Sequence, residues 1–132
     1  MVVILRAVIT LLCGVGLYVS LFMLAKTRRA ERGELLEPSV VTTPQARLYA
    51  GLPNSLLGTA FYPALAAACW WTDLAPVAVA VACAMGFAAI TSVALAYSLL
   101  FITKRPCPYC WTGHTINWSL ALLIAFLIKI SY

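Results

Sequence analysis

The sequence is poor in charge. Only 10% of its 132 residues are charged and 64% are hydrophobic, whereas soluble domains carry about one quarter charged residues. This balance excludes an ordinary soluble domain and predicts an integral, multi-pass membrane protein. Nine Lys and Arg residues against four Asp and Glu give a net charge of +5, and most of the cations fall in two short segments. Such clusters indicate membrane topology and lipid headgroups, so we expect no nucleic-acid partner.

The sequence also lacks internal repeats and any alternation of strand and helix patterns, and its apolar residues fall instead into four long runs. A helix needs about 20 apolar residues to cross the hydrocarbon core. The first run is long and is followed by cations, which favours a retained helix over a cleaved signal peptide. We therefore predict an all-α fold, an integral membrane four-helix bundle that forms a single membrane domain over 1–132. The expected helices lie at about 2–25, 54–72, 76–102 and 108–130, with a polar loop over 26–52.

Four spans place the polar loop and the segment KRPCPYC on one face of the membrane, and both termini on the other. Seven cations lie on the thiol face and two on the opposite face, which predicts a cytoplasmic thiol face by the positive-inside rule. The seven are Lys26, Arg28, Arg29, Arg32, Arg47, Lys104 and Arg105, and the two are Arg6 and Lys129.

A Cys-Pro-Tyr-Cys motif stands at the predicted start of the last helix. The spacing brings Cys107 and Cys110 close enough for a disulfide without backbone movement. Unpaired backbone N–H groups at a helix start, together with Lys104 and Arg105 just upstream, favour the thiolate form of Cys107. Pro108 suits an early helical position, where its missing N–H has no cost. The pattern favours a redox-active pair.

Three other interpretations remain open at this point. Cys107, Cys110 and His114 are soft ligands at one end of a helix, which is typical of a metal-binding or transport protein. The two cysteines could also lack any chemistry, or the chain could be a non-catalytic subunit of a membrane complex. A glutaredoxin is excluded because no strand and helix alternation is present to build its sheet.

Two segments, CPYCWTGHTIN and LPNSLLGTAFY, resemble the vitamin K epoxide reductase family. In that family a Cys-x-x-Cys pair opens the last helix and an Asn follows seven residues after the second Cys, here Asn117. A pattern of Asn, then Gly, then aromatic residues opens the second helix. The family consists of four-helix membrane proteins that couple a thiol pair to a quinone. The chain is similar to a short bacterial-type member, or to a homologue without the loop cysteine pair, and the expected location is a bacterial cell membrane.

The resemblance implies a quinone-dependent thiol oxidoreductase with a ubiquinone, menaquinone or vitamin K type of quinone. Cys110 would react with the quinone, and Cys107 would exchange with a thioredoxin-like or other dithiol protein. The implied quinone-binding residues are Asn54, His114, Phe61, Tyr62 and Asn117, with no metal. From the residues alone, Asn54 fits a plain helix cap equally well, His114 fits a helix boundary, and the two aromatic residues fit core packing.

The chain departs from the family in its first loop, because residues 26–53 contain no cysteine where better-known members carry a second pair. Cys69 lies 15 residues beyond Asn54, about 22 Å along a helix, and is predicted at the opposite end. Either a partner thiol reaches Cys107 directly, or the relay has been lost. Family precedent also places the thiol pair outside the cytoplasm, where disulfides persist, so the membrane face stays open.

Overall fold

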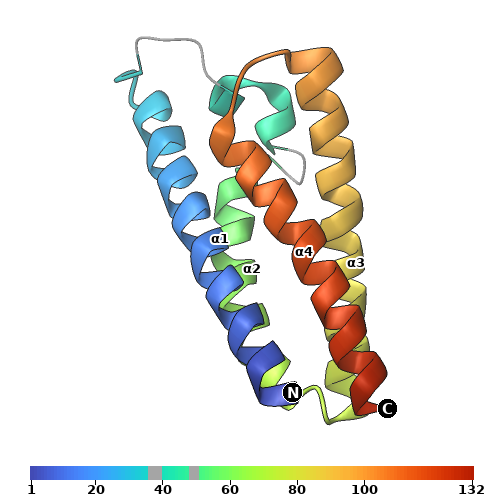
Figure 1. Ribbon diagram of the computed structural model, residues 1–132. Helices are drawn as coiled ribbons and strands as arrows, with labels where there is room; N and C mark the ends of the chain where they lie inside the picture. The colour runs from blue at the N-terminus through green and yellow to red at the C-terminus, as the bar shows by residue number, and fades with distance from the viewer. Residues whose placement is uncertain (36–39, 48–50) are drawn as a thin grey trace.

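The computed structural model describes residues 1–35, 40–47 and 51–132, and four α-helices dominate it (Figure 1). No strand occurs in these ranges, so the predicted all-α bundle is confirmed. The four helices are α1 (Val2–Glu31), α2 (Asn54–Ala68), α3 (Ala75–Ser98) and α4 (Pro108–Ser131). The short elements are the 3-10 helices η1 (Val40–Thr42), η2 (Pro44–Arg47) and η3 (Cys69–Trp71), and the π-helix η4 (Leu99–Thr103).

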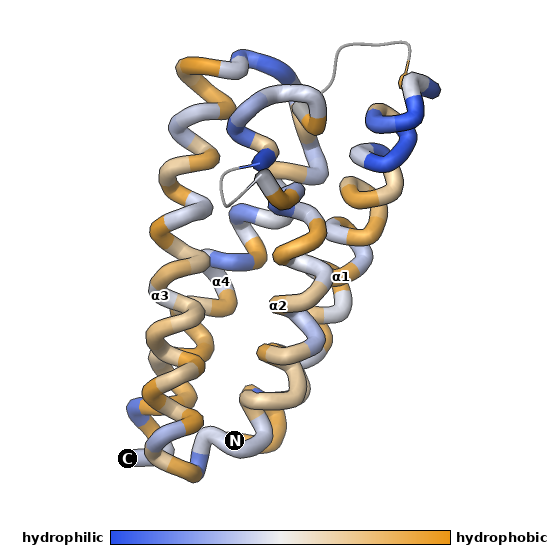
Figure 2. Tube along the Cα trace, turned by 180° about the vertical axis from the view of Figure 1, so that it is seen from behind, coloured by the Kyte–Doolittle hydropathy of each residue, from blue (hydrophilic) through white to orange (hydrophobic). Residues whose placement is uncertain are grey.

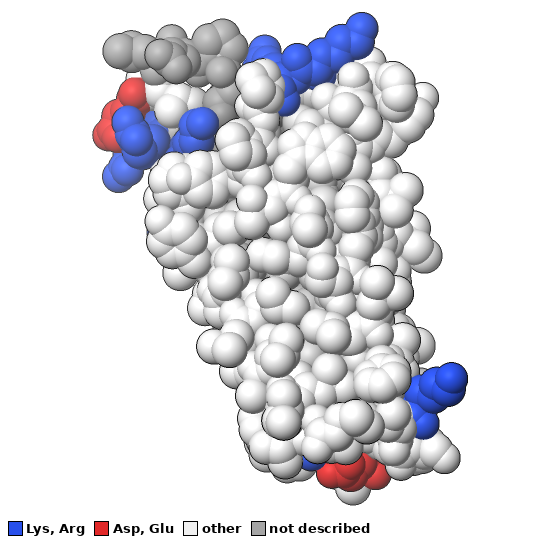
Figure 3. Space-filling model, viewed as in Figure 1, with Lys and Arg blue, Asp and Glu red and all other residues white. Residues whose placement is uncertain are grey.

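Three helical segments in the described ranges are long and apolar enough to cross a membrane: Val2–Glu31, Ala75–Thr103 and Pro108–Ser131. The fourth helix, α2, has 15 residues and continues directly into η3. Large apolar side chains such as Ile90 and Leu122 are more than two-thirds exposed, as lipid-facing residues are. Figure 3 shows charged side chains at the two ends of the molecule and an uncharged surface between them. The protein is an integral membrane protein.

The helices do not pack evenly. Helix α1 packs along α2 and α4, and α3 packs along α4, whereas α2 and α3 make few contacts. The core consists of the residues that α1, α2, α3 and α4 turn toward one another, among them Ile9, Leu65, Met85, Leu120 and Leu127. Because α2 and α3 are barely in contact, space remains between them.

Helix α1 ends later than the sequence predicted. It continues to Glu31 rather than to about residue 25, so the expected loop over 26–52 begins with six helical residues. Lys, Arg and Glu favour helix in water as well as Leu does, so the loss of apolar residues did not end the helix. Gly33, with φ of +72°, ends it: the N–H of Gly33 bonds Ala30 O and that of Glu34 bonds Arg29 O, which is a Schellman motif. Figure 2 shows these polar last turns.

The predicted loop is only partly described. It contains η1 and η2, and its residues 36–39 and 48–50 lie outside the described residues. Arg47, at the end of η2, forms an ion pair with Glu31 at the end of α1 and donates a hydrogen bond to Gly51 O at 2.9 Å. These contacts hold η2 over the same end of the bundle as the Cys-Pro-Tyr-Cys turn (Figure 1).

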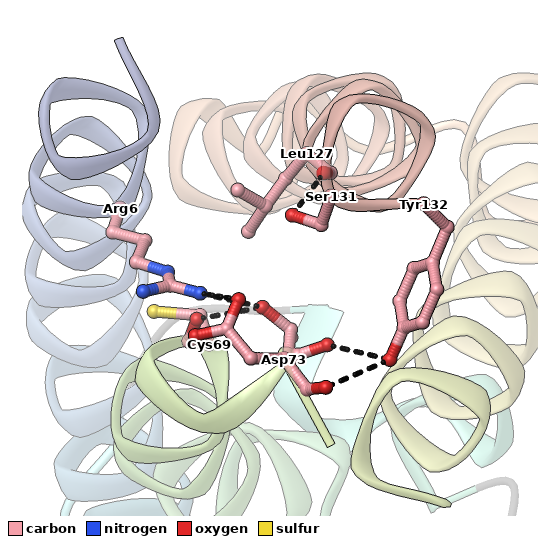
Figure 4. Close-up of polar contacts among 7 residues, drawn as sticks. Arg6, Cys69, Asp73, Leu127, Ser131 and Tyr132 are labelled. Atoms are coloured by element: carbon pink, nitrogen blue, oxygen red, sulfur yellow. Dashed lines mark hydrogen bonds and ion pairs between the residues drawn. The ribbon is translucent and has the colours of Figure 1, made fainter. Parts of the chain in front are cut away.

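A polar network closes the other end of the bundle (Figure 4). The guanidinium of Arg6 is buried and donates to Asp73 Oδ1 at 2.8 Å and to Thr72 Oγ1 at 3.4 Å. The hydroxyl of Tyr132 donates to the backbone oxygens of Thr72 and Asp73 at 3.2 and 3.1 Å. The start of α1 and the end of α4 are therefore both fixed to the turn between α2 and α3.

Candidate functional site

Cys107 and Cys110 form a disulfide at the start of α4, with their Cα atoms 5.3 Å apart. Cys107 is the N-cap of the helix, and its sulfur accepts a hydrogen bond from the backbone N–H of Cys110 at 3.2 Å. Pro108 is the first helical residue, as the sequence predicted. Lys104, with φ of 52°, lies in the left-handed region and turns the chain from η4 into this segment. The predicted closeness of the two sulfur atoms is confirmed.

A cavity of about 450 Å³ lies directly beside the disulfide. Cys110, Gly113, His114 and Asn117 line it from α4, and their spacing of three, four and seven residues puts them on one face of that helix. The two cysteines differ in position, because Cys110 lines the cavity whereas Cys107 lies outside it and is only 7% exposed.

Helix α2 forms the facing wall, and Asn54, Phe61 and Tyr62 all line the cavity from it. The structure therefore brings together around one cavity every predicted quinone-binding residue. These are Asn54, Phe61, Tyr62, His114 and Asn117. What each of them binds stays a prediction.

Asn54 does not act as the helix cap that its position allowed. Pro53 is the N-cap of α2, and Asn54 is the first helical residue. Its side-chain Nδ2 donates to the backbone oxygen of Gln45 at 2.8 Å. Gln45 belongs to η2 and lines the cavity too, so this bond fixes the loop to the top of the cavity wall.

His114 is buried, 8% exposed, and lies between two indole rings. Its ring centroid is 6.0 Å from that of Trp111 and 6.2 Å from that of Trp118. It is thus a cavity residue of the bundle and not one that faces headgroups. No group of three His, Cys, Asp or Glu side chains in the described ranges is arranged to hold a metal ion.

A hydrogen-bonded chain crosses the lower part of the cavity. The hydroxyl of Tyr62 donates to Asn117 Oδ1 at 2.6 Å, and Asn117 Nδ2 donates to Ser92 Oγ at 2.7 Å. The three side chains come from α2, α4 and α3, so the chain links three helices. Sequence reasoning missed this link, and it missed Ser92 altogether.

The disulfide turn is also held to α1. The ring of Tyr109, the residue before Cys110, stacks on Phe22 with centroids 4.0 Å apart and planes 17° from parallel. The sequence indicated only that Tyr109 lay inside the motif, and nothing marked Phe22 as its partner.

A second cavity of about 380 Å³ lies between α2 and α3, where these helices make few contacts. Its lining consists of apolar residues of the two helices. Phe61 and Ala84 line both cavities. The two cavities therefore adjoin at these two side chains, and the lining of both is mainly apolar.

The remaining cysteines lie away from the disulfide cavity. Cys13 and Cys69 are buried in the core, and Cys83 is exposed on α3. Thr10 Oγ1 is 3.9 Å from Cys69 Sγ, and Cys69 lies close to Asp73 at the opposite end from Cys107 (Figure 4). The prediction that Cys69 lies at the far end is confirmed, and none of the three cysteines lines the cavity.

The comparison with protein families gives a match over most of the chain. The profile of the vitamin K epoxide reductase family matches residues 7–125. No curated protein shows a significant match. The match covers α2 and α3 completely and most of α1 and α4, and it includes both segments that carried the resemblance.

Proposed function

We propose, from the premise that the chain belongs to the vitamin K epoxide reductase family, that it couples the Cys107 and Cys110 pair to a lipid-soluble quinone. Membership of the family makes the protein a membrane redox enzyme. One observation carries the more specific proposal: Cys110 lines a cavity of ligand size while Cys107 lies outside it. The two sulfur atoms of one disulfide thus have different surroundings.

The position of Cys110 suits a reaction with a quinone. Two thiols give up two electrons and two protons and form the S–S bond, while the quinone takes up the same electrons and protons to become a hydroquinone. Quinone oxygens gain negative charge in this step, so hydrogen-bond donors in the cavity stabilise it. His114, one turn along α4 from Cys110, lines the cavity as a candidate donor, and Asn117, two turns along, has a second amide N–H besides the one that bonds Ser92 Oγ.

The second cavity suits the apolar part of such a substrate. A quinone with an isoprenoid tail dissolves in the bilayer, and the second cavity, between α2 and α3, is apolar and adjoins the disulfide cavity at Phe61 and Ala84. We infer that the ring reaches Cys110 sideways between these two helices and that the tail lies in the second cavity.

Cys107 suits exchange with a water-soluble dithiol, because it lies at the polar end of the bundle. A thioredoxin-like or other dithiol protein would attack Cys107 and release Cys110 as a thiolate. Residues 26–53 contain no cysteine, so the exchange is direct in this chain. Cys107 is 7% exposed, so the segment before it must shift when the partner binds.

The direct test uses purified protein in detergent with ubiquinone-1 as oxidant and dithiothreitol as reductant. We expect the wild-type protein to consume both, and Cys110→Ala to lose this turnover. Cys83→Ala is the matched control, because Cys83 is exposed on α3 away from the cavity. Unchanged turnover in Cys110→Ala would refute the proposal.

A trapping experiment identifies the dithiol. In Cys110→Ser, the Cys107 thiolate attacks the disulfide of the oxidised partner and stays attached to it as a mixed disulfide, because the Cys110 thiol that would displace the partner is missing. Mass spectrometry of the adduct names the partner, and labelling with an impermeant thiol reagent in intact cells determines the membrane face.

A further inference from the structure

One cavity residue has a hydroxyl that none of the described residues bonds. Ser98, the last residue of α3, lines the disulfide cavity and is 6% exposed. Its Oγ is buried and has no hydrogen-bond partner within the described part of the chain. Other helical hydroxyls of this protein donate to the backbone oxygen four residues earlier, namely those of Thr10, Thr27, Thr59, Thr112, Thr115 and Ser131.

The packing register places Ser98 level with the disulfide. Helices α3 and α4 are antiparallel (Figure 1), and the bond between Asn117 Nδ2 and Ser92 Oγ at 2.7 Å fixes which residues face each other. Ser98 lies six residues above Ser92, and Cys110 lies seven residues above Asn117. At about 1.5 Å per residue these steps are roughly 9 and 10 Å, so Ser98 and Cys110 occupy the same level of the cavity.

The backbone around Ser98 is also irregular. The π-helix η4 begins at the next residue, Leu99. The backbone N–H of Lys104 donates to the carbonyl oxygen of Leu99, five residues earlier, at 3.0 Å, which is the hydrogen bond of a π-helix. This π-turn ends the helical segment, as π-turns at helix C-termini do, and it follows Ser98 directly. A buried hydroxyl without a partner costs stability, and Ser98 Oγ lies in the wall of a cavity of ligand size, where a ligand can supply the acceptor.

We propose that the Ser98 hydroxyl donates a hydrogen bond to a carbonyl oxygen of the bound quinone and is a further catalytic residue. The inference rests on the proposed quinone reaction. The two thiols pass two electrons and two protons to the quinone as their S–S bond forms, and the quinone oxygens gain negative charge on the way. A hydrogen bond to such an oxygen strengthens as the charge develops, so Ser98 acts mainly on the rate of the step.

The test compares Ser98→Ala, Ser98→Thr and Ser131→Ala in the ubiquinone-1 and dithiothreitol assay. Ser131 is the matched control, because its hydroxyl bonds Leu127 O at the far end of α4. We expect kcat of Ser98→Ala to fall about tenfold, the usual effect of one neutral hydrogen bond. The Kd of ubiquinone-1, measured by quenching of tryptophan fluorescence, changes by less than about threefold. Ser98→Thr restores the hydroxyl and most of kcat.

A second measurement separates this role from a structural one. Reduction of the disulfide by dithiothreitol without quinone should proceed at the wild-type rate in Ser98→Ala, because the hydroxyl acts on the quinone and not on the dithiol. Equal kcat in Ser98→Ala and Ser131→Ala, or an equal loss in the dithiol step, would overturn the role of Ser98. Absence of quinone turnover in the wild-type protein would instead overturn the proposed function itself.

Discussion

The contact between Gly16 and Tyr62 predicts that Gly16→Ala destabilises the protein, and the structure lets the loss be estimated. Gly16 is buried on α1, and a Cβ atom placed there would lie 2.6 Å from Cε1 and Cζ of Tyr62. The ring has little room to move aside, because Tyr62 is 4% exposed and its hydroxyl is bonded to Asn117 at 2.6 Å. Gly16→Ala therefore forces either α1 or the Tyr62 ring out of place.

The expected loss follows from two opposing terms. Overpacking of a filled core costs about 1–3 kcal/mol, and Ala gains about 1 kcal/mol over Gly in a helix interior. The net destabilisation is then about 0–2 kcal/mol, which lowers Tm by up to roughly 8 °C in a chain of this size. Gly14→Ala is the matched control on the same helix, because a Cβ there meets nothing within 4 Å, so its Tm should equal or exceed that of the wild type.

Thermal unfolding in detergent, followed by circular dichroism, measures both variants. Because the clash is with the aromatic ring, Gly16→Ala should cost much less in a Tyr62→Leu background. The variant should also weaken quinone turnover, since displacement of the ring breaks the bond to Asn117 on the cavity wall. If Gly16→Ala melts at or above the Tm of Gly14→Ala, the close approach of α1 and α2 described above is wrong.

Three other predictions concern different parts of the molecule. Asp73→Asn should lower Tm by roughly 4 °C, about 1 kcal/mol, because it leaves the buried Arg6 charge unpaired; Arg6→Met should cost less, since it removes that charge as well. A membrane-permeant maleimide should leave Cys13 and Cys69 of the oxidised native chain unlabelled, as mass spectrometry can show, and labelling of these two cysteines before unfolding would contradict their burial. Ala84→Trp, at the junction of the two cavities, should raise KM for a long-tailed quinone at least tenfold more than for ubiquinone-1, and equal changes in both KM values would argue against access between α2 and α3.

The sequence predicted the parts of the site that depend on spacing along one helix. Cys107, Cys110, His114 and Asn117 follow one another on the last apolar run, and helical periodicity alone assigns the last three to one face. The position of Pro108 likewise determined where the helix starts. Local pattern was sufficient here because each of these features is set within one element.

Features that depend on contacts between helices were not predictable in the same way. The bond from Tyr62 to Asn117 requires a particular register between α2 and α4, and the level of Ser98 requires one between α3 and α4. Neither register can be predicted from the spacing of apolar residues, because all four runs are hydrophobic on several sides and no single face is marked for packing. Gly16 illustrates the difficulty, since nothing in its neighbourhood on α1 marks it as the point where Tyr62 packs closely.

The later end of α1 was predictable in hindsight from one residue. The prediction of a loop from residue 26 assumed that the helix ends where it leaves the membrane. Charged residues such as Lys, Arg and Glu continue a helix into water. Gly33 follows the basic stretch and is the residue type that ends helices in the left-handed conformation. The position of this glycine predicts the helix end better than hydropathy does.

The uneven packing of the four helices has a consequence for biogenesis. Helix α4 packs on both α1 and α3, whereas α2 and α3 make few contacts despite the short turn between them. A nascent chain that has inserted only its first three helices therefore has an α1 and α2 pair with α3 held to it mainly by that turn. Insertion of α4 joins the two halves, completes the cavity walls and delivers the two thiols in the same event. The protein thus has neither a complete cavity nor a thiol pair until synthesis reaches its last helix.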